Sequence, residues 1–438
     1  MGNREIYAAS VAKEITGADC CRSASAAPAK IRSPPAFLWP RMLSPVPDPM
    51  TRTERRAGMA LASIFGLRMF GLFLILPVFA IYAPTVAGGN DSLMVGLALG
   101  AYGLTQALFQ IPYGIASDRW GRKPVIIAGL LLFALGSVVA AMATSIYWII
   151  AGRVIQGAGA ISAAVTALAA DLTREQHRTK IMAMIGSTIG LVFALSLIIA
   201  PLLYVQLGMA GIFWLTAILA LAAIVLLAKA VPSPPLPHRI VRTAFREVLL
   251  DGQLARLNFG VLALHMMQTA LWVVVPPLLV EVGGLPVGQH WQVYLPAVLL
   301  SFVVMVPAII AAEKYGQMKP VFVGAILCLV VVQGGLAWFG DDKYAIGLWL
   351  MVFFCGFNIM EAMQPSLISR LAPVEAKGTA LGIYNTTQSI GLFLGGALGG
   401  GLMKHFGAGV VQSFCAILGL VWLWLAATMT PPARRASS

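Results

Sequence analysis

The sequence is poor in charged residues. Only 11% of its 438 residues are Asp, Glu, Lys or Arg, whereas soluble domains carry about 25%. Hydrophobic residues make up 59% of the chain, above the roughly 45 to 50% that is usual for soluble domains. This composition excludes soluble enzymes, disulfide-stapled secreted domains and disordered regulators, and it predicts a membrane protein.

Motifs for metals, redox chemistry and nucleotides are also missing. The chain has five cysteines but no CxxC pair, no HExxH helix and no cluster with metal-ligand spacing. It lacks the GxxxxGK[ST] loop that cradles the phosphates of ATP. We therefore expect no cofactor, no metal and no catalytic residues. A polytopic membrane enzyme or a receptor-like sensor is the alternative class, but no catalytic dyad and no sizeable extracellular loop favours it.

Twelve apolar runs are each long enough to cross a hydrocarbon core of ~30 Å as a helix. They begin near Ala57, Leu93, Pro124, Ile146, Ile181, Gly211, Leu257, Gln292, Val321, Ala345, Gly378 and Ala408. We expect an all-α membrane protein with two pseudo-symmetric bundles of six helices.

The polar segments set the expected domain boundaries. The two bundles cover 57–231 and 256–430, and a Pro-rich, basic linker at 232–255 joins them. Residues 431–438 form a tail. Residues 1–56 have no apolar core suited to a signal peptide, so we expect a disordered extension, with Met50 as an alternative start of translation.

Basic residues gather in the gaps on one side of the predicted membrane. Those gaps hold, among others, Arg119, Arg174, Lys314 and Arg370, and the opposite gaps hold only Lys343 and Lys404. The positive-inside rule then places both termini and the linker in the cytoplasm. The net charge of +13 is explained by this orientation and by contact with anionic lipid, so we expect no nucleic-acid partner.

Few ionisable side chains fall inside the spans. Arg68, Arg153, His265 and Glu361 lie in the first, fourth, seventh and tenth runs. A charge at a helix centre costs ~2.5 to 3.5 kcal/mol on insertion scales, so each is a functional candidate. The spacing of three helices predicts that they line one central cavity.

Polar neighbours share helix faces with these residues. Gln156 follows Arg153 by one helical turn, and Asn358, Glu361 and Gln364 recur every three residues. We expect all of them to contribute to substrate or proton coupling. The alternative is structural: the arginines and Glu361 pair with one another or with backbone carbonyls, and His265 only bonds a neighbouring helix.

The loop from Gly114 to Pro124, GIASDRWGRKP, resembles the signature loop of the major facilitator superfamily. Arg153 followed by Gln156-Gly157 resembles the superfamily's motif in the fourth helix. Longer strings around Arg68, Asp171 and Glu361 resemble the YajR-type drug:proton antiporters, although we expect this chain to lack the small cytoplasmic domain that those carry after the twelfth helix. The antiporter motif of the fifth helix is only partly preserved, with Pro201 and small residues, which leaves the direction of transport open.

The resemblance implies a conformational latch. In the family, residues matching Asp118, Arg122 and Asp171 form a cytoplasmic charge cluster that locks the outward-facing state, with the first of them near the start of the eleventh helix at Gly378. The amide groups and dipole at a helix N-terminus favour a carboxylate by ~0.3 to 1 kcal/mol. Three further residues complete the expected latch, namely Gly114 for close packing, Gly121 for a tight turn, and Lys123.

Together these features predict a secondary active transporter of the bacterial inner membrane. The expected function is proton-coupled efflux of small amphipathic compounds by alternating access, with Glu361 as the proton-binding carboxylate. An uptake symporter or facilitator for a small metabolite is the alternative. We expect the protein to act as a monomer and to contact substrate, protons and membrane lipid.

Overall fold

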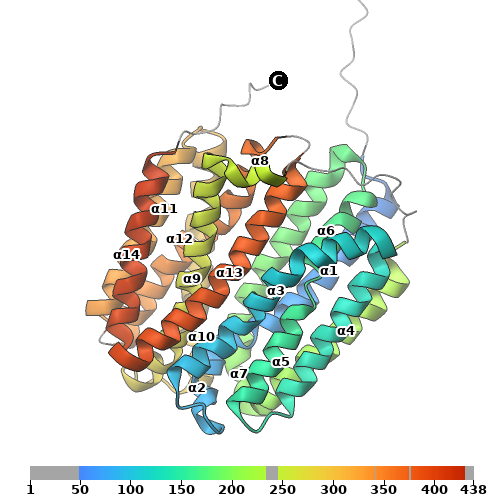
Figure 1. The fold of residues 1–438 in the computed structure, drawn as a ribbon. Helices are drawn as coiled ribbons and strands as arrows, with labels where there is room; N and C mark the ends of the chain where they lie inside the picture. Colours follow the sequence, from blue (N-terminus) through green and yellow to red (C-terminus); the bar gives the residue numbers. More distant parts are fainter. Residues whose placement is uncertain (1–48, 233–244, 341, 374–375, 430–438) are drawn as a thin grey trace, which may run out of the picture. The chain divides into compact units, whose positions relative to one another are not determined.

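The computed structural model describes residues 49–232, 245–340, 342–373 and 376–429 (Figure 1). Its first part contains α1 (Arg52–Phe73), α2 (Leu76–Tyr82), η1 (Ala83–Thr85), α3 (Ser92–Trp120), α4 (Arg122–Ala141), α5 (Ile146–Ala158), α6 (Ser162–Asp171) and α7 (Glu175–Ala230). Its second part contains α8 (Phe245–Leu250), α9 (Gly252–Glu281), η2 (Val287–Gln289), α10 (Trp291–Glu313), α11 (Met318–Trp338), α12 (Lys343–Leu371), α13 (Lys377–Phe406) and α14 (Ala408–Ala427).

Within the described ranges, ten helical segments are long and apolar enough to cross a membrane. One of them, Gln176–Ala230, holds two spans, because Gly208 at φ +66° interrupts α7. Helix α13 is not among the ten, since its glycines and polar residues lower its hydropathy, although it is 30 residues long. These segments, with α7 counted as two spans and α13 added, confirm the expectation of an all-helical membrane protein.

Helix α1 begins inside the segment that the sequence predicts to be disordered. The Thr51 hydroxyl accepts from the Glu54 amide at 3.1 Å, and the Glu54 carboxylate accepts from the Thr51 amide at 2.9 Å. The same carboxylate accepts from Nε and Nη2 of Arg174, each at 2.9 Å. Disorder up to residue 56 is therefore wrong for 52–56, because these contacts fix the first helical turn. The predictions for 1–48, for linker residues 233–244 and for the tail 430–438 lie outside the described residues.

The fourth span is divided, which its sequence does not predict. Helix α5 ends at Ala158 and α6 begins at Ser162, so the carbonyl of Gly159 is released from helical pairing. At this break the backbones of Gly129 and Gly159 are in contact, and a Cβ at Gly159 would overlap the Gly129 carbonyl. The close approach at the break therefore depends on glycine, and the Gly159 carbonyl accepts from the Ile161 amide at 2.9 Å instead of from a residue four positions later.

The two halves of the chain meet where α3 packs on α13 (Figure 1). A Cβ at Gly96 would overlap the carbonyl of Gly396, and a Cβ at Gly400 would overlap the carbonyl of Ser92. Small residues let helix backbones touch in this way. At the other end of α13, a Cβ at Gly378 would meet nothing within 4 Å. The close backbone contact therefore lies in the half of α3 that begins at Ser92 and reaches Gly103.

An ion pair closes the same end. Lys404 Nζ donates to Asp91 Oδ2 at 2.7 Å, and Asp91 Oδ1 caps α3 by accepting from the Leu93 amide at 2.9 Å. The hydrogen bond from Lys404, together with that amide, lowers the pKa of the Asp91 carboxyl below its ordinary value. Both side chains are partly exposed, so the pair contributes at most about 1 kcal/mol.

We predict that Gly396→Ala destabilises the protein and that Gly382→Ala does not. Both substitutions raise helix propensity, but a methyl at 396 overlaps α3, whereas a Cβ at 382 would meet nothing within 4 Å. Overpacking of this kind costs about 1 to 3 kcal/mol. Thermal unfolding in detergent measures the difference, and equal melting temperatures for the two variants would contradict the α3 and α13 packing.

We predict that Asp91→Asn weakens the α3 and α13 contact at neutral pH while keeping the helix cap. Because the pKa of Asp91 is lowered, the stability from its ion pair is fully present above the ordinary value of 3.8 and is lost as pH falls through the lowered pKa. The difference in melting temperature between wild type and variant should vanish in acid below the lowered pKa. A difference that persists in strong acid would refute this.

Candidate functional site

The only carboxylate expected deep in a span lies beside the only histidine expected there. Glu361 of α12 places Oε1 3.1 Å from Nε2 of His265 on α9. The His265 side chain is 5% exposed, and the Glu361 side chain is 33% exposed. The sequence predicts both residues separately, and helix packing brings them together from distant parts of the chain.

The imidazole of His265 has two further contacts. Its Nδ1 lies 3.0 Å from the carbonyl of Val261, and its Nε2 lies 2.6 Å from the amide nitrogen of Gln388 on α13. A carbonyl can only accept and an amide nitrogen can only donate. These contacts fit a neutral ring that carries its proton on Nδ1.

The polar residues on either side of Glu361 contact other helices. Asn358 donates to Ser301 of α10 at 2.8 Å, and Gln364 accepts from Tyr384 of α13 at 3.4 Å. The spacing of three residues thus points Asn358, Glu361 and Gln364 toward three neighbours. The prediction that they face away from lipid agrees with these contacts.

Arg68 is buried in the N-terminal half with its charge only partly satisfied. Its Nη2 donates to the Tyr102 hydroxyl at 2.7 Å, to Gln106 Oε1 at 3.4 Å and to the Gly159 carbonyl at 3.2 Å. The last acceptor is the one that the α5 and α6 break releases. The guanidinium also lies over the rings of Tyr102 and Phe133. Its Nε and Nη1 make no hydrogen bond to the described residues.

Arg153 is held by backbone and by its own helix. Its Nε donates to the Ala98 carbonyl at 3.2 Å and its Nη1 donates to Gln156 at 2.8 Å. Gln156 in turn donates to Ser137 of α4 at 2.7 Å, and the Arg153 guanidinium lies 5.1 Å from the centre of the Tyr102 ring. The prediction that Arg153 and Gln156 share a face is consistent with this contact.

The buried ionisable residues thus form two clusters. Arg68 and Arg153 share Tyr102 in the N-terminal half, and His265 and Glu361 pair in the C-terminal half. Within the part of the chain that the structure describes, no ion pair joins either arginine to Glu361. The arginines therefore match the structural alternative in part, because they bind backbone carbonyls.

An aromatic cluster joins the halves next to His265. Phe193 of α7 lies 6.1 Å from Phe354 and 5.9 Å from Phe357, ring centre to ring centre, and both partners belong to α12. Phe357 in turn contacts the His265 ring at 6.0 Å. The Glu361 and His265 pair therefore borders an apolar, aromatic environment.

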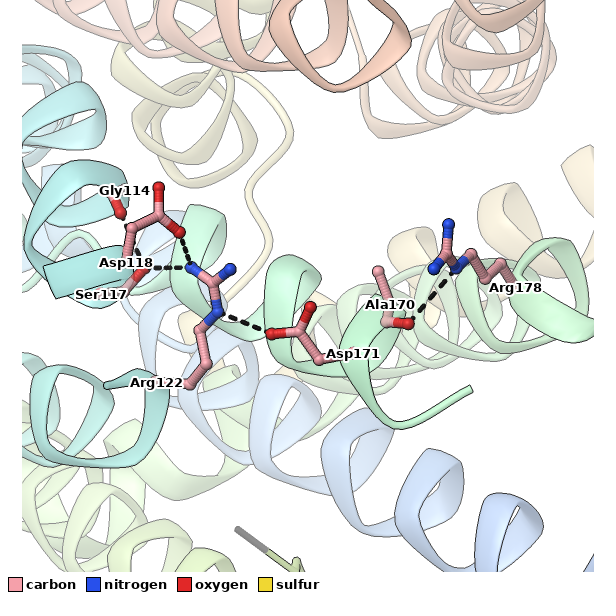
Figure 2. Close-up of polar contacts among 7 residues, drawn as sticks. All are labelled: Gly114, Ser117, Asp118, Arg122, Ala170, Asp171 and Arg178. Atoms are coloured by element: carbon pink, nitrogen blue, oxygen red, sulfur yellow. Dashed lines mark hydrogen bonds and ion pairs between the residues drawn. The ribbon is translucent and has the colours of Figure 1, made fainter. Parts of the chain in front are cut away.

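The expected latch residues assemble at the end of α3 (Figure 2). Arg122, at the start of α4, pairs with Asp118 on one side and donates from Nε to Asp171 Oδ2 at 2.8 Å on the other. Its Nη1 also donates to Ser117 at 2.8 Å, and the Ser117 hydroxyl donates to the Gly114 carbonyl. One guanidinium thus holds the ends of α3 and α6 together.

Backbone geometry explains part of the loop pattern. Gly121 has φ +92° between α3 and α4, a region that favours glycine. Gly114 differs from the expectation of close packing, because a Cβ there would meet only Ala163 at an ordinary 3.8 Å. Lys123 is half-buried in the first turn of α4.

The start of α13 has room for a side chain at Gly378. Gly378, which the family resemblance places near Asp118, has space for a Cβ with nothing within 4 Å. The α3 and α13 contact described above lies at the opposite ends of these helices. The structure thus shows the Asp118, Arg122 and Asp171 cluster together with halves that meet at the Asp91 end.

An equivalent ion pair occurs in the second half. Arg370, at the end of α12, donates to Glu313, at the end of α10, at 2.6 Å. Asp118 and Asp171 occupy the corresponding ends of the second and fourth spans. In each half, ion pairs therefore connect the ends of the second and fourth spans. In the first half the connection runs through Arg122 of the third span, whereas in the second half Arg370 and Glu313 pair directly.

Three contact residues were missed by the sequence analysis. Tyr102 and Gln106 of α3 contact Arg68, and Gln388 of α13 contacts His265. The polar run Asn385-Thr386-Thr387-Gln388-Ser389 inside a predicted span was the signal that could have identified the last of them.

Comparison with known proteins agrees with this architecture. The chain is 44% identical over 389 residues to the inner membrane transport protein YajR of Escherichia coli, which covers 87% of this chain and 85% of that protein. It is 27% identical to the multidrug resistance protein MdtH of Aeromonas hydrophila, over 86% of this chain and 93% of that protein.

Solved structures show the same fold. The D-xylose-proton symporter superposes with a TM-score of 0.69 at 17% identity, covering 86% of this chain and 98% of that one. The sequence profile of the Major Facilitator Superfamily matches residues 59–395. The transporters of this superfamily are not enzymes. Because the profile matches most of the chain and the YajR relative is 44% identical, the chain belongs to the Major Facilitator Superfamily of secondary transporters.

Proposed function

We propose that this transporter exports small amphipathic compounds in exchange for protons. The observation that carries the proposal is the pair of His265 and Glu361, whose facing atoms lie 3.1 Å apart inside the spans. Two groups at this distance can hold one proton between them, which neutralises a carboxylate that is expensive to bury. Binding of a cationic group near Glu361 would displace that proton, which is the thermodynamic basis of exchange.

The surroundings of the pair favour amphipathic substrates, which have an apolar part and a polar part. Phe193, Phe354 and Phe357 supply aromatic surface next to His265. In the N-terminal half, Nε and Nη1 of Arg68, which have no hydrogen-bond partner in the described part of the chain, offer donors for a polar or anionic substituent. MdtH, a relative over most of the chain, is described as a multidrug resistance protein, which supports the same substrate class.

We infer that the face carrying Arg122 and Arg370 is cytoplasmic, because basic residues concentrate there. The halves then touch at the outer face, at Asp91 and Lys404, and the described conformation faces inward. The bacterial inner membrane follows from the same orientation and from the likeness to YajR. Asp118 would reach the start of α13 when the halves close at the cytoplasmic face and so stabilise the outward-facing state.

Uptake in symport with protons is the second candidate. The partly preserved motif in the fifth span, around Pro201, supports it. Both candidates use the same proton site, so the direction of flux against an imposed pH gradient decides between them.

We predict that Glu361→Gln abolishes transport driven by a pH gradient. The glutamine keeps the size of the side chain but cannot release a proton, so substrate binding can no longer drive deprotonation. Proteoliposomes loaded with ethidium, an amphipathic cation, and subjected to a pH jump measure the flux. The expected loss is about 5- to 150-fold, since the coupling energy of two sites is typically 1 to 3 kcal/mol.

The matched control is Glu281→Gln, because Glu281 is an exposed carboxylate at the end of α9. It should transport like wild type. Undiminished pH-driven flux in Glu361→Gln, with normal protein yield, would refute the proton-site assignment.

We predict that Asp118→Asn shifts the protein toward the described conformation. The variant keeps Arg122 paired with Asp171 but loses the carboxylate that would bind the start of α13. The expected change is about two- to fivefold in the ratio of the two states, equivalent to ~0.3 to 1 kcal/mol. Spin-label distances between the ends of α3 and α13 measure it, with Asp251→Asn at the α9 cap as the control. An unchanged distance distribution would argue against the latch.

A further inference from the structure

Gln388 reaches the proton pair from a third helix. Its amide nitrogen lies 2.6 Å from His265 Nε2, while Nδ1 of the same ring faces the Val261 carbonyl. The amide nitrogen needs an acceptor, so this contact requires that Nε2 carry no proton. Gln388 on α13 therefore contacts the neutral form of His265.

Glu361 approaches the same ring nitrogen. Its Oε1 lies 3.1 Å from His265 Nε2, and a carboxylate oxygen can only accept. If Nε2 took up a proton, it would donate a hydrogen bond to Glu361. The same proton would then point at the amide hydrogens of Gln388, which also need an acceptor. The two contacts are mutually exclusive, because one ring atom cannot accept from Gln388 and donate to Glu361 at once.

The next residue on α13 bonds the other half of the protein. Ser389 is fully buried and accepts from Gln106 of α3 at 3.1 Å, and Gln106 in turn accepts from Arg68 at 3.4 Å. A Cβ at Gly103 would come within 2.5 Å of the Ser389 carbonyl, so the two helix backbones touch here. From this point the contact of α3 with α13 extends to Lys404.

We propose that Gln388 is a positioning residue that couples the proton on His265 to the contact between α3 and α13. Protonation of Nε2 expels the Gln388 amide, and the displaced side chain disturbs α13 at the residue that binds Gln106. The ionisable groups facing the switch are Glu361 from α12 and Tyr384 from α13, and Arg68 connects to it through Gln106. The proposal rests on the proposed function, since it takes His265 and Glu361 as the proton site.

The test follows the conformation as a function of pH and needs no substrate. Spin labels at the Asp91 end of α3 and the Lys404 end of α13 report whether that contact is closed. Gln388→Met keeps the side-chain length but removes the bond that favours neutral His265. The midpoint of the closed-to-open transition should rise by about 0.5 to 1 pH unit, which corresponds to the loss of one hydrogen bond.

Two further variants sharpen the result. Gln388→Glu replaces the donor with an acceptor for the protonated ring, so its midpoint should rise further than that of Gln388→Met. Gln333→Met is the matched control, because Gln333 is a buried glutamine of α11 whose amide atoms have no hydrogen-bond partner among the described residues. Its midpoint should equal that of wild type.

The failures of the two proposals are distinguishable. A wild-type midpoint in Gln388→Met overturns the role of Gln388, and if that variant does not fold, an unshifted midpoint in Gln388→Glu does the same. A normal pH response in Glu361→Gln overturns the proton site instead. A wild-type protein whose closed fraction does not change with pH overturns both.

Discussion

A charge inside a membrane must find a partner, and this constraint organises the buried polar contacts of the structure. The arginines meet it with carbonyls, hydroxyls and ring faces, and two nitrogens of Arg68 have no hydrogen-bond partner among the described residues. Glu361 meets it with His265, a partner whose charge can change. The first solution is fixed and the second is reversible, so the proton site that we propose lies in the C-terminal half.

The backbone contact between α3 and α13 connects the C-terminal half to the N-terminal half. Glycines allow α3 and α13 to touch from Ser389 to Lys404, and the Asp91 ion pair closes the end of the contact. A packed contact of this kind has discrete arrangements instead of deforming gradually. The charge cluster of Asp118 lies at the other end of α3, and a Cβ at Gly378 in the first turn of α13 would meet nothing within 4 Å. In the proposed transport cycle, the contacts at both ends of the α3 and α13 pair would form and break.

Much of the fold could be predicted from the sequence, because span length and hydropathy follow directly from the bilayer. The errors have local causes. The start of α1 depends on the Thr51 cap and on Arg174, which is distant in sequence. The break after Ala158 depends on the Gly129 and Gly159 contact, which no periodicity reveals.

The site was predictable as a set of residues but not as a set of contacts. The scarcity of charge identified Arg68, Arg153, His265 and Glu361 in advance. Which of them meet depends on the packing of α9 against α12, and a single sequence does not encode that in any local pattern. Gln388 escaped notice because it is uncharged, although its contact with His265 is as close as any in the site.

The most direct measurement of the central claim is infrared difference spectroscopy of the purified protein between about pH 8 and pH 5. If His265 and Glu361 share a titrating proton, wild type will show bands of a carboxyl group and an imidazole that change together. Glu361→Gln will lose the carboxyl band and alter the imidazole band. Identical difference spectra for wild type and Glu361→Gln would contradict the account.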